Sequence, residues 1–228
     1  MSGTQTVLAA AAVAVMIFAV AGGMVYARNQ VDKARLRGVR EWADAHGWAF
    51  TDENPRPPWH DRPPQEDFRL GLLLEGQVDG RDATIGCGSY DVRKSVGGAD
   101  GSKRSQNVTY HLTVLTVRAE DGTPDMEVRE RGLGAKLMAS LARNATDADA
   151  FDARFEVEPP EARGRLSAVA VQAHLDSEIP AWNVRDGEIT AVLPGRTRAE
   201  DLDGHVAMLR RLGEIVATTG NAAASPEG

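Results

Sequence analysis

An uncharged apolar run occupies residues 7–26, close to the start of the chain. At about 1.5 Å of rise per helical residue the run reaches about 30 Å, the thickness of the hydrocarbon core of a bilayer. The flank before it, residues 1–6, carries no charged side chain, whereas a signal peptide starts with a basic segment. We therefore expect residues 7–26 to form an uncleaved transmembrane helix. A cleaved signal peptide and a buried core helix are the alternatives.

Basic residues cluster directly after the run, and none precedes it. Because Lys and Arg stay on the cytoplasmic side, we expect a single-pass protein of the cell membrane with its N-terminus outside and its C-terminal domain in the cytoplasm. An exported domain of the same architecture is the alternative. The basic cluster can contact anionic lipid headgroups, or it can only set topology and solvate a helix. Its members are Arg28, Lys33, Arg35, Arg37 and Arg40.

The remaining residues are enough for one sizeable domain or two small ones. We expect a juxtamembrane helix at 27–47, a soluble domain at 48–217 with a sub-boundary near 131–150, and a disordered tail at 218–228. The formal net charge is −7, which argues against a nucleic acid as partner because such binding needs a basic surface.

Alternation of polar and apolar residues predicts an antiparallel meander in the first half of the domain. A strand at 48–51 is followed by residues 68–78, where the residues assigned to one face are Phe68, Leu70, Leu72, Leu74 and Val78. Asp79-Gly80 predicts a tight hairpin into a strand at 82–90. The polar stretch 91–106 is predicted to be a loop, and 108–117 is the clearest strand of the chain.

Helices prevail in the second half. Leu133, Leu137 and Leu141 share a helical face, and Pro159-Pro160 is expected to start a helix with Val169 in its apolar stripe. Asp186-Gly187 predicts a second hairpin, and Thr197 with Glu200 forms a capping box for an amphipathic last helix. Strands and helices are segregated, so the expected class is α+β: a transmembrane helix, then a mostly antiparallel sheet packed with C-terminal helices.

Three short segments resemble a family of uncharacterised single-pass membrane proteins from actinobacteria. They are a Trp-Ala-x-x-x-Gly-Trp segment at 42–48, the run 151–157 and the run 182–189 ahead of a terminal amphipathic helix. The resemblance implies a membrane anchor followed by an α+β domain with no known activity. It implies no functional residues.

A search for catalytic and metal-binding patterns finds none that has the required spacing, so we expect neither an enzyme nor a cofactor or metal. The five histidines include no HExxH and no i, i+4 pair. Cys87 falls on the apolar face of a strand, where a thiol acts as a small buried hydrophobe. Carboxylates at 147–161 span a loop and a polar strand face, which is typical of a solvated surface.

The proline-rich loop offers a candidate surface for a protein partner. Pro55, Arg56, Pro57 and Pro58 fit a PxxP pattern, and Trp59 is an aromatic of the kind found at binding hot spots. In the alternative interpretation the loop is a stiff linker folded back onto the sheet with Trp59 buried.

We expect a membrane-tethered, non-enzymatic domain that mediates protein interaction at the cytoplasmic face of a bacterial membrane. The absence of catalytic motifs and the presence of an anchor carry this expectation. Two other functions remain open. One is a small-ligand or lipid-binding module in which a curved sheet encloses a pocket against the C-terminal helices, and the other is an enzyme whose site assembles from distant segments.

Overall fold

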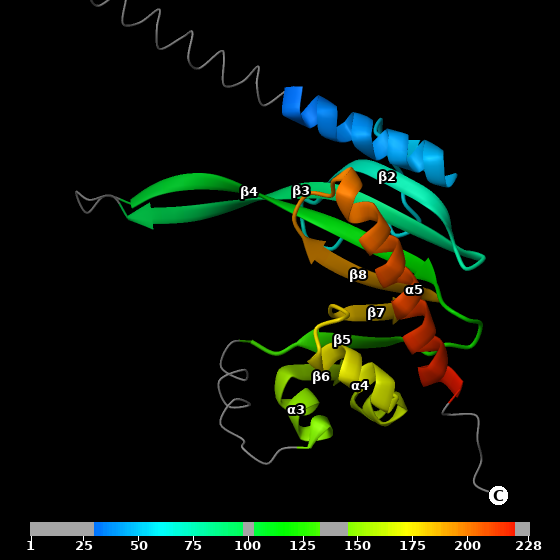
Figure 1. The fold of residues 1–228 in the computed structure, drawn as a ribbon. Coiled ribbons are helices and arrows are strands. Elements are labelled where there is room, and N and C mark those ends of the chain that lie inside the picture. Colours follow the sequence, from blue (N-terminus) through cyan, green and yellow to red (C-terminus); the bar gives the residue numbers. More distant parts are fainter. Residues whose placement is uncertain (1–29, 98–102, 133–145, 222–228) are drawn as a thin grey trace, which may run out of the picture.

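The computed structural model describes residues 30–97, 103–132 and 146–221. They form one eight-stranded antiparallel sheet in the order β1-β2-β3-β4-β8-β7-β5-β6 (Figure 1). The α+β class with an antiparallel sheet is confirmed. The strands are β1 Ala49–Thr51, β2 Arg69–Val78, β3 Arg81–Gly97, β4 Lys103–Arg118, β5 Met126–Glu130, β6 Phe155–Glu158, β7 Trp182–Arg185 and β8 Glu188–Pro194.

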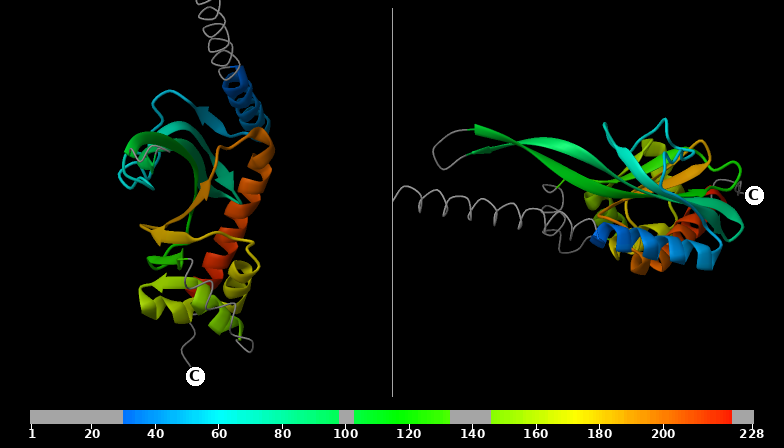
Figure 2. Two further views of the ribbon diagram at one scale, coloured as in Figure 1. Left: turned by 90° about the vertical axis from the view of Figure 1, so that its left-hand side faces the viewer. Right: turned by 90° about the horizontal axis from the view of Figure 1, so that it is seen from above.

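Helices cover one face of this sheet, which we call the inner face (Figure 2). The N-terminal helix (residues 30–46) and α5 (Ala199–Asn221) lie across it, and α3 (Asp147–Arg154), η1 (Pro160–Arg165) and α4 (Ala168–Leu175) pack at its β5–β6 end. One continuous hydrophobic core fills the space between these layers.

The N-terminal helix is part of the domain. Val39 and Ala43 are fully buried in the core, and Trp42 Nε1 donates a hydrogen bond of 2.9 Å to Asp203 Oδ1 of α5. The helix ends at Gly47, whose φ of +72° suits the left-handed C-terminal position expected of a glycine. The helix expected at 27–47 is therefore present over the described residues 30–46, but it packs into the core of the domain expected to start at 48.

Both predicted hairpins are confirmed. Asp79 and Gly80 join β2 to β3 with φ of 51° and 76°, and Asp186 and Gly187 join β7 to β8 with φ of 53° and 73°. Two consecutive positive φ values are the signature of a type I′ turn, whose twist matches that of the flanking strands. The second hairpin brings β8 beside β4 and so joins the two halves of the chain in one sheet.

A β-bulge in β2 changes the expected pattern of that strand. The register shifts between Leu70, which faces Gly88, and Leu72, which faces Cys87. An extra residue in one strand reverses which face the following side chains occupy. Leu72, Leu74 and Val78 thus lie in the core, whereas Phe68 and Leu70 lie over Gly88 and Gly86 on the opposite face. The prediction that all five share one face is wrong.

The polar stretch 91–106 is not a loop over most of its described length. Here β3 continues to Gly97 and pairs with β4 from Lys103 onward. The pairing of β3 with β2 ends at Ser89, and that of β4 with β8 begins at Leu112. Residues 90–97 and 103–110, which we call the arm, therefore form a two-stranded ribbon that projects from the body (Figures 1 and 2).

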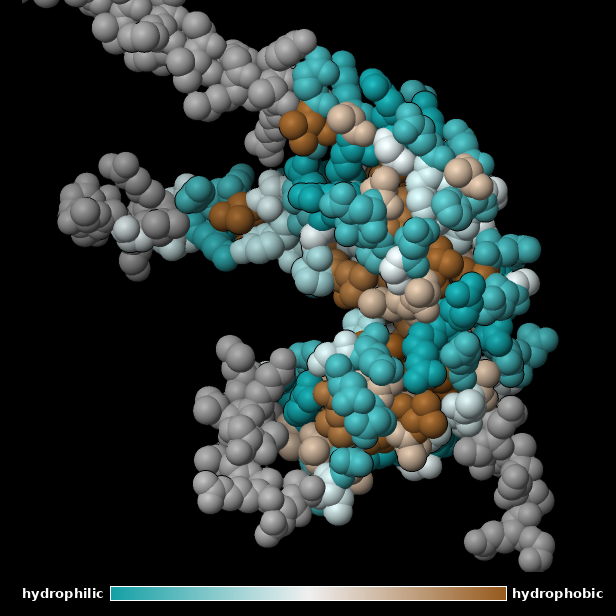
Figure 3. Space-filling view, viewed as in Figure 1, coloured by the Kyte–Doolittle hydropathy of each residue, from teal (hydrophilic) through white to brown (hydrophobic). Residues whose placement is uncertain are grey.

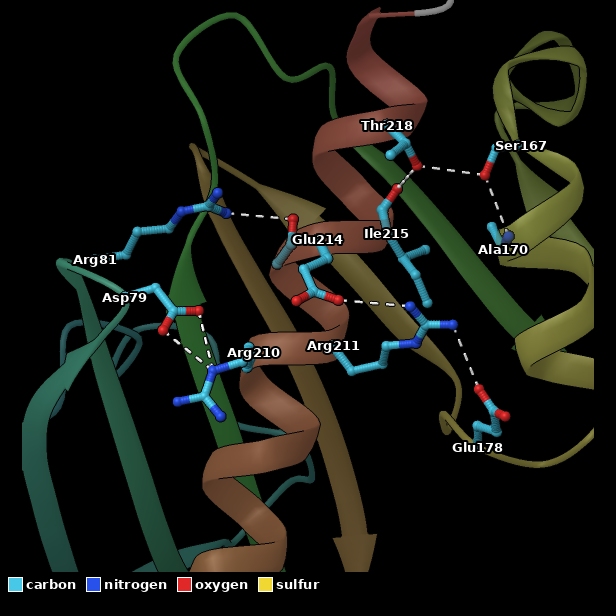
Figure 4. A network of polar contacts seen from close by, with 11 residues as sticks. Asp79, Arg81, Ser167, Ala170, Glu178, Arg210, Arg211, Glu214, Ile215 and Thr218 are labelled. Atoms are coloured by element: carbon cyan, nitrogen blue, oxygen red, sulfur yellow. Dashed lines mark hydrogen bonds and ion pairs between the residues drawn. The ribbon is translucent and has the colours of Figure 1, made fainter.

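Helix α5 connects both ends of the molecule on the inner face. Arg210 Nε contacts both carboxylate oxygens of Asp79 at 3.1 Å, in the β2–β3 turn. The next residue, Arg211, pairs with Glu178 at 3.5 Å, and near the C-terminal end Thr218 meets Ser167, the N-cap of α4, at 3.3 Å (Figure 4). The helix continues to Asn221, so the disordered tail expected from 218 does not begin there.

The start of α5 differs from the predicted capping box. The Thr197 side chain is buried and hydrogen-bonds Thr113 at 2.6 Å, so it does not cap the helix. Instead the backbone N–H of Arg198 donates to Asp201 Oδ2 at 2.9 Å, which satisfies one of the free donors of the first turn. The sequence pattern assigns Thr197 to the helix cap, but in the structure its side chain binds Thr113 of β4 instead.

The segment after Pro159 is also divided differently. A 3₁₀ turn, η1, ends at Arg165, and α4 starts separately with Ser167 as its N-cap. Val169 is 52 % exposed and does not belong to the buried stripe expected of it. The helix expected around Leu133, Leu137 and Leu141 lies outside the described residues, as does most of the sub-boundary at 131–150.

Of the helices that the structure describes, none combines the length and apolarity needed to cross a bilayer. The run 7–26, for which a transmembrane helix is expected, lies outside the described residues.

Candidate interaction face

The sheet face opposite the helices, the outer face, is covered only in part. The loop 52–67 lies over it at β3 because two glycines make room for aromatic rings. A Cβ on Gly86 would come within 2.7 Å of Trp59, and one on Gly88 within 2.4 Å of Phe68. Strand positions without side chains let large rings approach the backbone closely. The glycines therefore decide where the loop is seated.

Trp59 is the anchor of this loop and not an exposed hot spot. Only 4 % of it is exposed, and its Nε1 donates a 3.3 Å hydrogen bond to Thr84 Oγ1. Pro57 is buried as well, Pro55 is half-buried, and Arg56 and Pro58 are exposed. The expectation of an accessible Trp59 is thus wrong, and Trp59 is buried against the sheet as in the alternative interpretation. Partner binding by Pro55, Arg56 and Pro58 stays a prediction.

Arg62 holds the far end of the loop. Its Nη1 lies 2.9 Å from Asp186 Oδ2 in the β7–β8 turn, and its Nη2 lies 3.7 Å from Glu188 at the start of β8. Burial raises the pKa of the Glu188 carboxyl, while Thr116 and Arg62 act in the opposite direction. The loop is therefore tied to β3 by Trp59 and to β8 by Arg62.

A groove of about 370 Å³ runs beside the loop on the outer face. Its charged residues are paired: Arg185 Nη2 lies 3.0 Å from Glu127 Oε2, and Arg62 binds Asp186 in the neighbouring β7–β8 turn. Val192 is 36 % exposed within it. The other lining residues are apolar or uncharged, namely Trp59, Pro63, Pro64, Val114, Asn183 and Thr190.

The arm carries the apolar surface of the outer face further. Its cross-strand pairs Tyr90↔Tyr110 and Val92↔Val108 alternate with the polar pairs Asp91↔Thr109 and Arg93↔Asn107. The two tyrosine rings stack at 5.6 Å, and all four apolar or aromatic side chains are half-buried. Strand alternation places this stripe on the same face as Gly86 and Gly88, which is the outer face. Figure 3 shows the arm standing clear of the rest of the described surface, with apolar atoms among hydrophilic ones.

The opposite face of the arm is polar. Asp91 accepts a 2.6 Å hydrogen bond from Thr109 and pairs with Arg69, and the Thr109 bond is the main reason why the pKa of this carboxyl is lowered. The arm therefore has one solvated face and one apolar face, like a strand pair that covers a core.

The predicted lipid contacts divide into two groups. Arg35 and Arg40 turn toward the domain: Arg35 Nη1 donates to the Thr197 carbonyl at 3.0 Å, and Arg40 pairs with Asp52 at 3.2 Å and stacks on Phe50. Lys33 and Arg37 are exposed, and neither forms an ion pair with the described residues. Arg28 lies outside the described residues.

No metal centre is formed by the described residues, since no three His, Cys, Asp or Glu side chains gather there. Cys87 is 6 % exposed, and burial raises the pKa of its thiol. His174 is buried among aromatic rings, where burial lowers its pKa to about 4. Cys87 and His174 are therefore both buried side chains.

Sequence reasoning missed the arm and the groove. The alternation at 108–114 was visible, but it does not say whether the apolar face turns to the helices or away from them. In the structure the core receives Thr113, Leu115 and Val117, so Val108, Tyr110 and Leu112 point outward. The signal that could have found the arm is the continued Tyr-x-Val pattern at 90–92, opposite Val-x-Tyr at 108–110.

Comparisons with known proteins add a fold neighbour. No protein-family model matches the chain, and no curated protein matches it in sequence. A solved structure, the mycobacterial trehalose monomycolate transport factor A, superposes with a TM-score of 0.50 at 14 % sequence identity. The match covers 80 % of this chain and 94 % of that one. At this identity the likeness shows a shared fold.

Proposed function

We propose that this chain is a membrane-tethered, non-enzymatic domain that binds a protein partner at the cytoplasmic face of a bacterial membrane. The observation that carries the proposal is the apolar stripe on the projecting arm, made of Tyr90, Val92, Val108 and Tyr110. The tether at 7–26 and the cytoplasmic orientation rest on the apolar run and on the basic residues that follow it.

The physical state of the arm supports a docking role. A two-stranded ribbon is at best marginally stable in water unless its apolar side packs against another surface. The arm extends roughly 25 Å at 3.3 Å per residue, and among the described residues no third strand lies along either of its edges. A partner that covers Tyr90 and Tyr110 would remove two half-exposed rings from water, and tyrosine is enriched at binding hot spots.

The groove extends this docking surface onto the body. The charged side chains at its rim are already paired, so a partner would meet an apolar floor at Val192 without leaving a buried charge unpaired. A surface of this kind suits an apolar loop or strand of another protein. Lys33 and Arg37 would meanwhile contact anionic lipid headgroups beside the tether.

The fold neighbour adds a class of partner. That protein is named a mycobacterial trehalose monomycolate transport factor. By analogy of fold alone, we propose a membrane transport system as the source of the partner.

A pair of neighbouring substitutions tests the docking face. Val108→Asp adds a negative charge on the apolar face of the arm, and Asn107→Asp adds the same charge one residue away on the polar face. The full chain is expressed in its membrane with a photo-crosslinker at Tyr110, and crosslinked proteins are identified by mass spectrometry. We expect one discrete membrane-protein adduct, reduced at least about tenfold by Val108→Asp and unchanged by Asn107→Asp.

Crosslinking that responds equally to both substitutions, or that yields only lipid adducts, would overturn the docking role. The orientation is tested separately by reporters fused after Gly228, one active only inside and one active only outside the cytoplasm. Activity of the inside reporter is expected. Activity of the outside reporter would place the domain beyond the membrane and leave the arm as a docking surface for an extracytoplasmic partner.

A further inference from the structure

A second cavity lies on the inner side of the sheet, away from the groove and the apolar face of the arm. It has a volume of about 280 Å³ and sits where the N-terminal helix and the segment before α5 meet the sheet. The side chains that matter for its chemistry come from five different parts of the chain: Asp32, Arg35, Arg69, Cys87, His111 and Arg196.

The charges around this cavity do not balance. Three guanidinium groups line it, against the single carboxylate of Asp32. That carboxylate is engaged by Arg196, whose Nη1 lies 2.7 Å from Asp32 Oδ1. Arg69, which reaches the rim and is largely exposed, is paired with Asp91 outside the cavity.

Arg35 is the guanidinium that no carboxylate of the described residues neutralises. Its Nη1 donates to the Thr197 carbonyl at 3.0 Å, which is a neutral acceptor. Its Nε is buried and, within the described part of the chain, has no hydrogen-bond partner. Leaving a buried N–H of a charged group without a hydrogen-bond acceptor costs free energy, so an acceptor at this nitrogen would be favourable.

His111 adds no compensating negative charge. Burial is the main reason why its pKa is lowered, and the positive charges of Arg196 and Arg35 lower it further, against the opposite effect of Asp32. Its ring is therefore neutral at physiological pH and available as a hydrogen-bonding group. A local excess of positive charge in a chain of net charge −7 attracts an anion.

We propose that this cavity binds a small oxyanion, a phosphate or carboxylate group, with Arg35 and Arg196 as its main ligands. The planar fork of an arginine donates two parallel hydrogen bonds to such a group, and the Nε of Arg35 would supply one of them. A phosphate fills only part of 280 Å³, so the group it belongs to has room to follow. Two sources share this chemistry: a lipid headgroup and a soluble phosphate ester.

This inference does not rest on the docking role of the arm, because the cavity and the arm stripe lie on opposite faces of the sheet. The probe is inorganic phosphate, titrated into the full chain in neutral detergent micelles at constant ionic strength set with chloride. Binding is followed by the thermal midpoint and by the imidazole resonances of His111.

We expect a saturable rise of the midpoint with phosphate and a rise of the His111 pKa toward its usual value, because a bound anion offsets the two arginines. The groups that face this ring are Asp32 and Arg35 from the N-terminal helix, Arg69 from β2 and Arg196. Arg35→Gln should weaken phosphate binding at least tenfold. Arg210→Gln, which removes an exposed guanidinium from the Asp79 pair, is the matched control and should bind as the wild type does.

The absence of a saturable phosphate effect, or equal binding by Arg35→Gln and the wild type, would overturn the proposal. If Arg35→Gln loses its native circular dichroism, Arg196→Gln serves instead with the same criterion. Repeating the titration in nanodiscs that contain phosphatidic acid separates the sources. Loss of inorganic phosphate binding there supports the lipid headgroup as ligand, and unchanged binding supports a soluble phosphate ester.

Discussion

The indole Nε1 of Trp182 donates a 3.0 Å hydrogen bond to Nε2 of His174, and both side chains are buried in the core. Trp182 comes from β7 and His174 from α4, so this bond joins the sheet to its end helices. Because Nε2 accepts, the proton of a neutral ring sits on Nδ1, for which the described residues offer no partner. Phe151 and Phe155 complete the surroundings, with ring centroids 5.5 and 4.7 Å from the imidazole.

This arrangement makes stability depend on pH. Burial lowers the pKa of His174 to about 4 in the folded state, whereas the unfolded chain retains a value near 6.5. Between these values the unfolded state binds more protons, so the free energy of unfolding falls as pH falls through this window and levels below it. The total loss from this residue is about 3 kcal/mol.

Urea unfolding at several pH values between 7 and 4 measures the effect. His174→Gln keeps an acceptor for Trp182 and cannot be protonated, so its stability should fall less steeply than that of the wild type. His60→Gln changes an exposed loop histidine and should keep the wild-type slope. Parallel curves for wild type and His174→Gln would contradict the prediction.

Gly86→Ala should unseat the loop 52–67. The added Cβ would lie 2.7 Å from Cζ2 of the buried Trp59 ring and 3.1 Å from Leu70 Cδ1. We expect a loss of about 1–3 kcal/mol of stability from overpacking, with Trp59 becoming accessible to acrylamide quenching. Gly71→Ala is the control, since its Cβ would make an ordinary 3.6 Å contact with the Cys87 carbonyl oxygen. Equal quenching in both variants would show that Gly86 does not position the loop.

Removal of the arm should leave the domain folded. Joining Tyr90 to Tyr110 through an Asn-Gly turn deletes a ribbon that, in the part of the chain the structure describes, pairs with no third strand and contributes no residue to the core. We expect the far-ultraviolet circular dichroism of an intact sheet and a thermal midpoint within a few degrees of the wild type. The crosslink at the docking face should disappear at the same time. A shortened chain that unfolds would mean that the arm is structural.

The thiol of Cys87 should react slowly in the folded protein. Burial raises its pKa, and the thiolate is the reactive species. At pH 8 we expect alkylation by iodoacetamide to be at least about tenfold slower in the native protein than in the same chain unfolded in urea. Mass spectrometry of the labelled fraction over time measures both rates. Equal rates would show that the thiol is open to solvent.

Local patterns of the sequence were sufficient for a large part of the fold. The Asp-Gly pairs at 79–80 and 186–187 specify type I′ hairpins because few other residues adopt two successive positive φ values. The apolar spacing of Leu202, Leu209 and Leu212 specifies the buried side of α5. Such features depend on residues that are close in the chain, so they can be read without the tertiary structure.

Only the tertiary structure decided which face of each strand is buried and which is exposed. Periodicity states that Val108, Tyr110 and Leu112 share a side, but the helices cover the other side, and this leaves an apolar stripe on the arm. The bulge between Leu70 and Leu72 likewise depends on how β2 pairs with β3. In the sequence Arg35 is one of several basic residues after an apolar run. In the fold, its helix packs beside the segment that leads into α5, and the Arg35 side chain lines a cavity there. Local sequence sets the spacing of side chains, whereas contacts between distant segments determine which of them are buried, exposed or brought together.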